Sequence, residues 1–345
     1  MPIVTLRLPA VKLSPTARPT ACPGCGWKRL MRWGSPTKLI RDPQLQQVTV
    51  FRYRCCRCQR SFRVYPAGVD RATQTLRLRQ LAAITWGLGL SLRSVVAVFD
   101  AFGTELSRMS VWRDGQEVAM HIRQRRQSQP ARVLGVDGTG SRVCGHGTGI
   151  VVAVDLGTGV PVAVAKLDEK DPRAVTAWLG PLVHQFGVEV IVTDDLGSYR
   201  RVAEGLGVYH QVCVWHLWRW IGRALTALRP HLVAWEAVIT EVWQLVRTLP
   251  PDGAQRLLQL WAQLPAEGAA FRQKTALDRL RQIIWHLHHG WQSYRLTLER
   301  ADVPRTNNGT EQTIGRFKSR SKQVRGHKVW SGVEQTMLLS SGMRS

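Results

Sequence analysis

Two short apolar runs, each typical of a buried strand, lead into acidic residues. Residues 133–136 precede Asp137, after which a glycine-rich sequence is expected to end the strand, and residues 188–195 end in Asp194 and Asp195. Buried or crowded carboxylates are costly unless a cation compensates their charge. The pattern therefore predicts a metal site at one edge of a sheet. The alternative is that each aspartate merely caps a turn or the next helix.

The composition is strongly basic. The 345 residues include 48 Lys and Arg against 24 Asp and Glu, a formal net charge of +24. This excess predicts a polyanionic partner, for which nucleic acid is the first candidate and a membrane surface the alternative. We find no apolar run long enough to span a bilayer, and the proline-rich N-terminus lacks the apolar core of a signal peptide. We therefore expect a cytoplasmic protein of two or three domains without structural disulfides.

Two Cys-x-x-Cys pairs lie in the N-terminal region, Cys22 with Cys25 and Cys55 with Cys58. A short β-rich segment separates them, as in a zinc ribbon, in which four thiolates form a closed tetrahedral structural site. The alternative is a set of reduced cysteines without a metal. The first interpretation predicts one structural Zn²⁺.

The region after the cysteines predicts three helices. The third begins with the sequence SRMSVWR, and a helix, a short turn and such a helix resemble a helix-turn-helix. In that arrangement the third helix enters the major groove of DNA, with Arg108, Ser110 and Arg113 as the residues that face it. The alternative is a plain three-helix bundle whose arginines form a solvated surface.

A different pattern follows a linker near residue 130. Residues 131–216 predict three hairpin-type strands, a helix, a strand, a second helix and a fifth strand over 208–216. This is the order of an RNase H-like core, in which the first and fourth strands are neighbours, so Asp137 and Asp194 would converge. Residues 217–305 predict helices rich in tryptophan. Most of these tryptophans are expected in the core, and a few could stack on unpaired bases.

The last segment combines an acidic residue with a basic helix. Asn308 is the predicted N-cap and Glu311, three residues later, is positioned for a capping box. The cations that follow, with no acid among them, are Arg316, Lys318, Arg320, Lys322, Arg325 and Lys328. A basic helix that begins with a glutamate predicts a place where a phosphodiester meets a metal.

The order of these motifs resembles the DDE transposases of bacterial insertion sequences, and most of all the Mutator-like and related C-x-x-H types. The resemblance rests on Asp137 after its strand and on TDDLGSY at 193–199, CVWH at 213–216 and TNNGTE at 306–311. It covers nearly the whole chain.

By this resemblance Asp137, Asp194 and Glu311 form the metal-binding triad, and Cys213 and His216 have a structural or supporting role. Asp194 is chosen over Asp195 because it directly follows the strand.

The resemblance implies a multidomain α/β protein with an RNase H-like core. The predicted domains are an extended lead-in (1–20), a zinc ribbon (21–68), a helix-turn-helix domain (69–128), the first part of the catalytic core (131–216), an all-helical insertion (217–305) and the last part of the core, with its glutamate-bearing basic helix (306–345).

The implied activity is DNA transposition. Three carboxylates suit Mg²⁺ or Mn²⁺, and two such ions would support strand cleavage by water and joining of the freed 3′-hydroxyl to target DNA. The partners would be double-stranded transposon ends and target DNA, bound by a homodimer or larger oligomer in the prokaryotic nucleoid. Two alternatives remain: a catalytically silent DNA-binding regulator derived from such an enzyme, and an RNase H-like nuclease without joining activity. No covalent protein–DNA intermediate is needed, which disfavours a tyrosine or serine recombinase.

Overall fold

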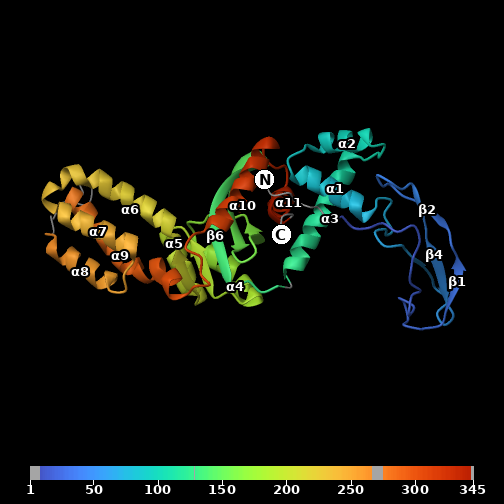
Figure 1. Ribbon diagram of the computed structural model, residues 1–345, viewed down its shortest axis with the longest axis horizontal. Helices are drawn as coiled ribbons and strands as arrows, with labels where there is room; N and C mark the ends of the chain where they lie inside the picture. Colours follow the sequence, from blue (N-terminus) through green and yellow to red (C-terminus); the bar gives the residue numbers. More distant parts are fainter. Residues whose placement is uncertain (1–7, 128, 266–274, 343–345) are drawn as a thin grey trace. The chain divides into compact units, whose positions relative to one another are not determined.

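The protein has a mixed α/β fold, as predicted. The computed structural model describes residues 8–127, 129–265 and 275–342 (Figure 1). The chain divides into two compact units, of which the first comprises Met1–Arg125 and Ser319–Arg344 and the second Arg126–Lys318. Of the predicted lead-in, residues 1–7 lie outside the described residues, and 8–20 contain neither helix nor strand.

The first unit begins with short antiparallel strands. A three-stranded sheet has the order β1–β4–β5, and a separate hairpin pairs β2 with β3. The strands are β1 (Leu30–Gly34), β2 (Thr37–Leu39), β3 (Gln47–Thr49), β4 (Phe51–Cys55) and β5 (Ser61–Val64). Leu30 and Tyr53 are buried together with two of the cysteines, so the small core of this sheet is built around the cysteine pairs.

Among the described residues, four helices lie wholly or almost wholly within the first unit. They are α1 (Leu76–Gly87), α2 (Leu92–Ala101), α3 (Arg108–Gln127) and α11 (Trp330–Gly342). The hydroxyl of Ser91 caps α2 as predicted, and that of Ser107 accepts a hydrogen bond from the first turn of α3. Leu338 and Leu339 of α11 are buried in the core of α1, α2 and α3. Residues 319–342 thus belong to the same unit as these helices rather than to the second unit, because the apolar side chains of α11 are buried there.

The second unit contains a five-stranded mixed sheet of order β10–β9–β6–β7–β8. Its strands are β6 (Val133–Val143), β7 (His146–Asp155), β8 (Val160–Ala165), β9 (Val190–Thr193) and β10 (Tyr209–Val212). β6, β7 and β8 are antiparallel neighbours, whereas β9 runs parallel to both β6 and β10. The expected pairing of the first and fourth strands is therefore confirmed.

Two helices cover one face of this sheet, α4 (Pro172–Phe186) and α5 (Gly197–Leu206). Asp171 caps α4 and Pro172 occupies its first turn, as the sequence predicts. Leu179 and Val202 pack with Leu134 of β6 in one apolar cluster. The packing of α4 and α5 therefore buries this face of the sheet in an apolar layer.

The prediction that the first strand ends at Asp137 was wrong. β6 continues to Val143, and Gly138 pairs with Val151 of β7. The strand reverses only at Cys144 and Gly145, both with positive φ, in a two-residue turn. The glycines do not end the strand because β7 supplies hydrogen-bonding partners along its whole length.

The fifth strand is also shorter than predicted, since it ends at Val212 and Cys213 is the N-cap residue of α6. The helices from here to residue 299 are α6 (Val214–Leu228), α7 (Glu236–Thr248), α8 (Gly253–Gln263) and α9 (Ala276–Glu299), with 3₁₀ turns at Arg229–His231 and Val233–Trp235 (Figure 1). They share one apolar core, which includes the buried Trp291. Residues 266–274 of the predicted insertion lie outside the described part of the chain. Among the described helices, none has the length and apolar character needed to cross a membrane.

Candidate active site

The strand register brings Asp137 and Asp194 to the same level of the sheet. Gly135 of β6 pairs with Val192 of β9, and the two aspartates each lie two residues further along these parallel strands. β9 ends at Thr193, so Asp194 is the first residue beyond it. The two carboxylates thus emerge together where the β6–β9 pairing stops.

The helix that carries Glu311 is anchored to the same strand. The side-chain amide of Asn307 donates a hydrogen bond to the carbonyl oxygen of Val136 (3.1 Å). A Cβ atom at Gly135 would lie 2.1 Å from Thr310 Oγ1, so only glycine permits this approach. α10 (Asn308–Gln323) therefore starts against β6, two residues from Asp137.

Glu311 does not occupy the capping-box position that would follow from Asn308 as the N-cap. The N–H of Glu311 donates to the carbonyl oxygen of Asn307 (3.1 Å), which makes Asn307 the N-cap and Asn308 the first helical residue. Glu311 is therefore one residue beyond the capping-box position. Its Oε1 atom is buried without a hydrogen-bond partner.

Glu311 instead faces the first turn of α6. His216 Nδ1 lies 3.6 Å from Glu311 Oε1, and ligand atoms of Cys213, His216 and Glu311 all lie within 4.8 Å of one another. The backbone N–H of Asn307 points to Cys213 Sγ (3.5 Å), which ties the start of α6 to the start of α10. The C-x-x-H residues thus support the segment that carries the glutamate.

The electrostatics of these carboxylates favour a nearby positive charge. Burial, together with the negative charges of Asp194, Glu169 and Glu311, raises the pKa of Asp137 to about 7. Burial also raises the pKa of Asp194. Carboxylates held in this way are stabilised in their ionised form by a bound cation, and oxygen ligands suit a hard divalent one. The residues present therefore fit Mg²⁺ or Mn²⁺.

Asp195 has a different environment from its neighbour. Its carboxylate accepts hydrogen bonds from His286 Nε2 (2.9 Å) and from the hydroxyl of Tyr294 (3.2 Å), both on α9. Asp195 therefore attaches the loop after β9 to the helical insertion. This leaves Asp194 as the residue that faces the other carboxylates.

Sequence reasoning missed a fourth carboxylate. Glu169 lies in the loop between β8 and α4, and a Cβ atom at Gly138 would lie 1.8 Å from its Oε2. The hydroxyl of Tyr199 donates to the same oxygen (3.4 Å). Burial and the charge of Asp194 raise the pKa of Glu169. Nothing in the local sequence distinguishes it from the other acids of that loop, because only the fold brings the loop over β6.

The four N-terminal cysteines have the geometry of a tetrahedral metal site. Cys22 Sγ lies 3.7 Å from Cys58 Sγ, Cys25 Sγ lies 3.6 Å from Cys55 Sγ, and all four atoms are within 4.8 Å of one another. Four thiolates about 2.3 Å from a central Zn²⁺ would be separated by roughly 3.8 Å. Burial alone would raise the pKa of Cys55, but backbone N–H groups of Cys58 and Arg57 lower it to about 6. The residues therefore fit Zn²⁺.

The predicted DNA-binding residues differ in exposure. Arg108, Arg113, Lys318 and Lys322 are exposed, whereas Ser110 and Arg316 are half-buried. The Ser110 hydroxyl lies 3.0 Å from that of Ser107, and Arg316 donates to Gln312 (3.3 Å).

Arg320 is a correction to the predicted set. It is 3% exposed, donates to the carbonyl oxygens of Gly89 and Leu90, and stacks on the ring of Trp86. Its guanidinium is used to bind the end of α1 and does not reach solvent.

Comparison with known families gives a match in the second half of the chain. Residues 171–333 match the model of the transposase IS66 family. The matched segment is just under half of the chain and contains Asp194, Cys213, His216 and Glu311, but not Asp137. It supports a DDE-type insertion-sequence transposase and does not confirm the Mutator-like subtype. A search of curated proteins found no match.

Proposed function

We propose that this protein is a DNA transposase that cleaves the ends of an insertion sequence and joins the freed 3′-hydroxyl to target DNA. The proposal is supported by the β6–β9 pairing, which brings Asp137 and Asp194 to the same level of the sheet, and by the hydrogen bond from Asn307 to Val136, which anchors the start of the helix that carries Glu311 to β6. The order of the five strands, with β6 between β7 and β9, supports the proposed RNase H-like core. The match to the IS66 transposase family supports the same conclusion.

Each residue of the site has a proposed role. Asp137, Asp194 and Glu311 would hold two divalent cations, and Glu169 lies close enough to add negative charge. When bound, these ions activate the attacking oxygen and stabilise the leaving oxygen of the phosphodiester. His216 positions Glu311, and Cys213 holds the start of α10 in place. Asp195 positions Asp194 by attaching the loop to α9.

The exposed cations are proposed to bind the DNA. Arg108 and Arg113 of α3 would read the cognate end in the major groove, while Lys318 and Lys322 would contact phosphates. The four-cysteine zinc ribbon adds a second basic module. Two such modules favour recognition of a specific DNA end over a nuclease that only cleaves, and intact carboxylates favour an enzyme over a silent regulator.

A metal-dependent cleavage assay tests this proposal. Purified variants are incubated with a labelled duplex taken from the DNA that flanks the coding sequence, with and without Mg²⁺. We expect Asp137→Asn and Asp194→Asn to bind the duplex and fail to cleave it, because a neutral amide is a poor ligand for a hard cation. Asp195→Asn is the matched neighbour and should retain most of the cleavage, because its amide oxygen can still accept the hydrogen bonds from His286 and Tyr294 that hold the loop. An inactive Asp195→Asn beside an active Asp194→Asn would contradict the assignment.

A further inference from the structure

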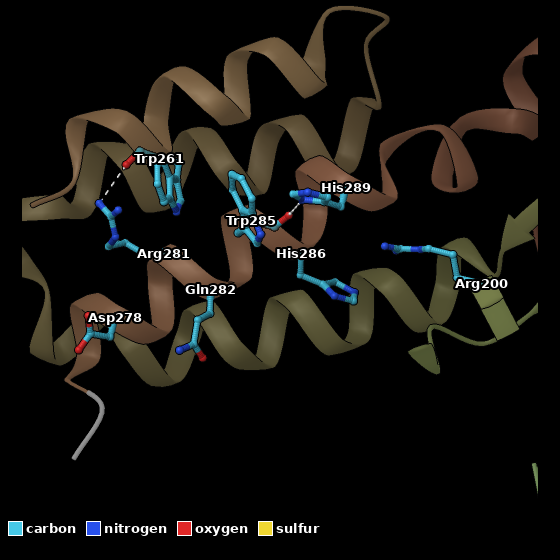
Figure 2. Close-up of a pocket in the computed structure, with 8 residues that line it drawn as sticks. All are labelled: Arg200, Trp261, Asp278, Arg281, Gln282, Trp285, His286 and His289. Carbon is cyan, nitrogen blue, oxygen red and sulfur yellow. Dashed lines mark hydrogen bonds between the residues drawn. The ribbon is translucent and has the colours of Figure 1, made fainter. Parts of the chain in front are cut away.

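The second unit contains a cavity of about 520 Å³ that the proposed chemistry does not use (Figure 2). It is lined by Trp261 of α8, by Arg281, Trp285, His286 and His289 of α9, and by Arg200 of α5. A cavity of this size suits one nucleotide and is too small for a DNA duplex.

Aromatic rings form one wall of the cavity. Trp285 is 44% exposed, unlike Trp291 on the same helix, which is buried in the core. The Trp285 ring lies with its centroid 4.3 Å from that of His289 and 5.1 Å from that of Trp261 (Figure 2). Trp285 therefore offers an indole surface that the helical bundle does not need for its own packing.

Positive charge lies on both sides of these rings. Arg281 stacks on Trp261, with its guanidinium carbon 4.2 Å from the ring centroid, and Arg200 lies beyond His286 (Figure 2). The one carboxylate in the lining, Asp278, accepts hydrogen bonds from Thr275 in the capping box of α9. The cavity is thus an aromatic surface in a cationic setting, which excludes a purely apolar ligand.

Hydrogen-bonding groups complete the lining. His289 Nδ1 lies 2.9 Å from the carbonyl oxygen of Trp285. Because a carbonyl oxygen can only accept a hydrogen bond, Nδ1 carries the proton, and Nε2 of the neutral ring can accept a hydrogen bond from a ligand. His286 Nε2 lies 2.9 Å from Asp195, the neighbour of Asp194. The cavity wall is therefore hydrogen-bonded to the loop that carries part of the candidate active site.

We propose that this cavity binds an unpaired nucleotide of a DNA strand, with its base stacked on Trp285 and its phosphate beside Arg200. Every base has a flat face that an exposed aromatic ring can stack on, and a cation nearby attracts the backbone phosphate. A base inside a duplex has no free face, so the site selects unpaired DNA. The inference rests on the proposed function, since strand cleavage near an end provides unpaired nucleotides for this site.

The test uses the full-length protein and measures binding without added Mg²⁺. The probes are a DNA duplex with a short single-stranded overhang containing 2-aminopurine, the same duplex fully paired, and the free nucleotide dAMP. We expect tighter binding to the overhang duplex, with quenched 2-aminopurine fluorescence. Trp285→Ala should weaken this binding by roughly 5- to 150-fold and leave binding to the paired duplex unchanged. His289→Ala should weaken it in the same direction.

Matched variants separate stacking from folding. Trp285→Phe keeps an aromatic face and should retain most of the quenching, while Leu298→Ala removes a 51% exposed apolar side chain of the same helix and should have no effect. The inference is overturned if Trp285→Ala and His289→Ala bind the overhang as wild type does, or if dAMP binds as tightly as the overhang duplex. Because no cleavage is required, failure of this binding would leave the cleavage tests of the proposed function unaffected.

Discussion

Replacement of Arg320 by alanine separates a structural cation from the proposed DNA-binding cations of α10. The buried guanidinium donates to Gly89 and, at 2.8 Å, to Leu90, and its carbon lies 4.7 Å from the centroid of the Trp86 ring. Hydrogen bonds from a charged donor contribute about 1.5–3 kcal/mol each, and removal leaves two carbonyl groups without partners. After allowance for the cost of burying the charge, we expect Arg320→Ala to lose about 2–4 kcal/mol of unfolding free energy. For a unit of this size that lowers the Tm by roughly 5–15 °C.

Lys322→Ala is the matched control, because Lys322 is exposed on the same helix. It should keep the wild-type Tm. The slope of log DNA affinity against log salt concentration should fall by about one, the effect of losing one phosphate contact. The assays are thermal unfolding and DNA affinity at several salt concentrations, measured well below the Tm of Arg320→Ala. The reasoning is refuted if Arg320→Ala keeps the wild-type Tm and loses DNA affinity.

Three further predictions test other parts of the structure. Burial raises the pKa of Asp114 to about 6, so its contribution to stability is full below pH 4 and is lost as the pH rises through 6. Asp114→Asn should therefore add roughly 1–3 kcal/mol to the free energy of unfolding at pH 8 and nothing below pH 4, as measured by denaturation at both pH values. Elemental analysis should find that Cys25→Ser loses zinc and that Cys56→Ser retains it, because Cys56 lies outside the four-cysteine cluster. Equal zinc content in the two variants would exclude the zinc ribbon. Arg108→Ala and Arg113→Ala should weaken binding to the cognate end more than to random DNA in titrations, and an equal loss on both would assign these residues to phosphate contacts.

Much of the fold could be predicted from local patterns. Asp171 with Pro172 and Ser91 marked helix starts that the structure confirms, because capping chemistry involves only neighbouring residues. The Cys-x-x-Cys pairs predicted the four-cysteine cluster for the same reason: each pair is a local turn, and the sheet needs only to bring the two turns together.

The errors arose where distant segments decide the outcome. Gly138 suggested the end of a strand, but pairing with β7 continues it, and no local pattern reports that partner. Asn308 suggested an N-cap, but Asn307 takes that position because its amide is held by Val136 on β6. Glu169 was missed since its place beside Asp137 depends on the path of a loop. The three carboxylates of the proposed triad could be predicted because the sequence marks the segment before each one, as an apolar run before Asp137 and Asp194 and as a helix start before Glu311.

The most direct test of the proposed chemistry is the substitution Glu311→Gln. Glu311 does not cap α10, and its Oε1 has no hydrogen-bond partner, so glutamine should fit with little change in stability. As a ligand, however, Glu311 must supply negative charge to a hard cation, which an amide lacks. The measurement is Mg²⁺-dependent cleavage and joining of a labelled DNA end, beside thermal stability and DNA affinity. The account predicts near-normal stability and binding with loss of both reactions, and catalysis retained by Glu311→Gln would contradict it.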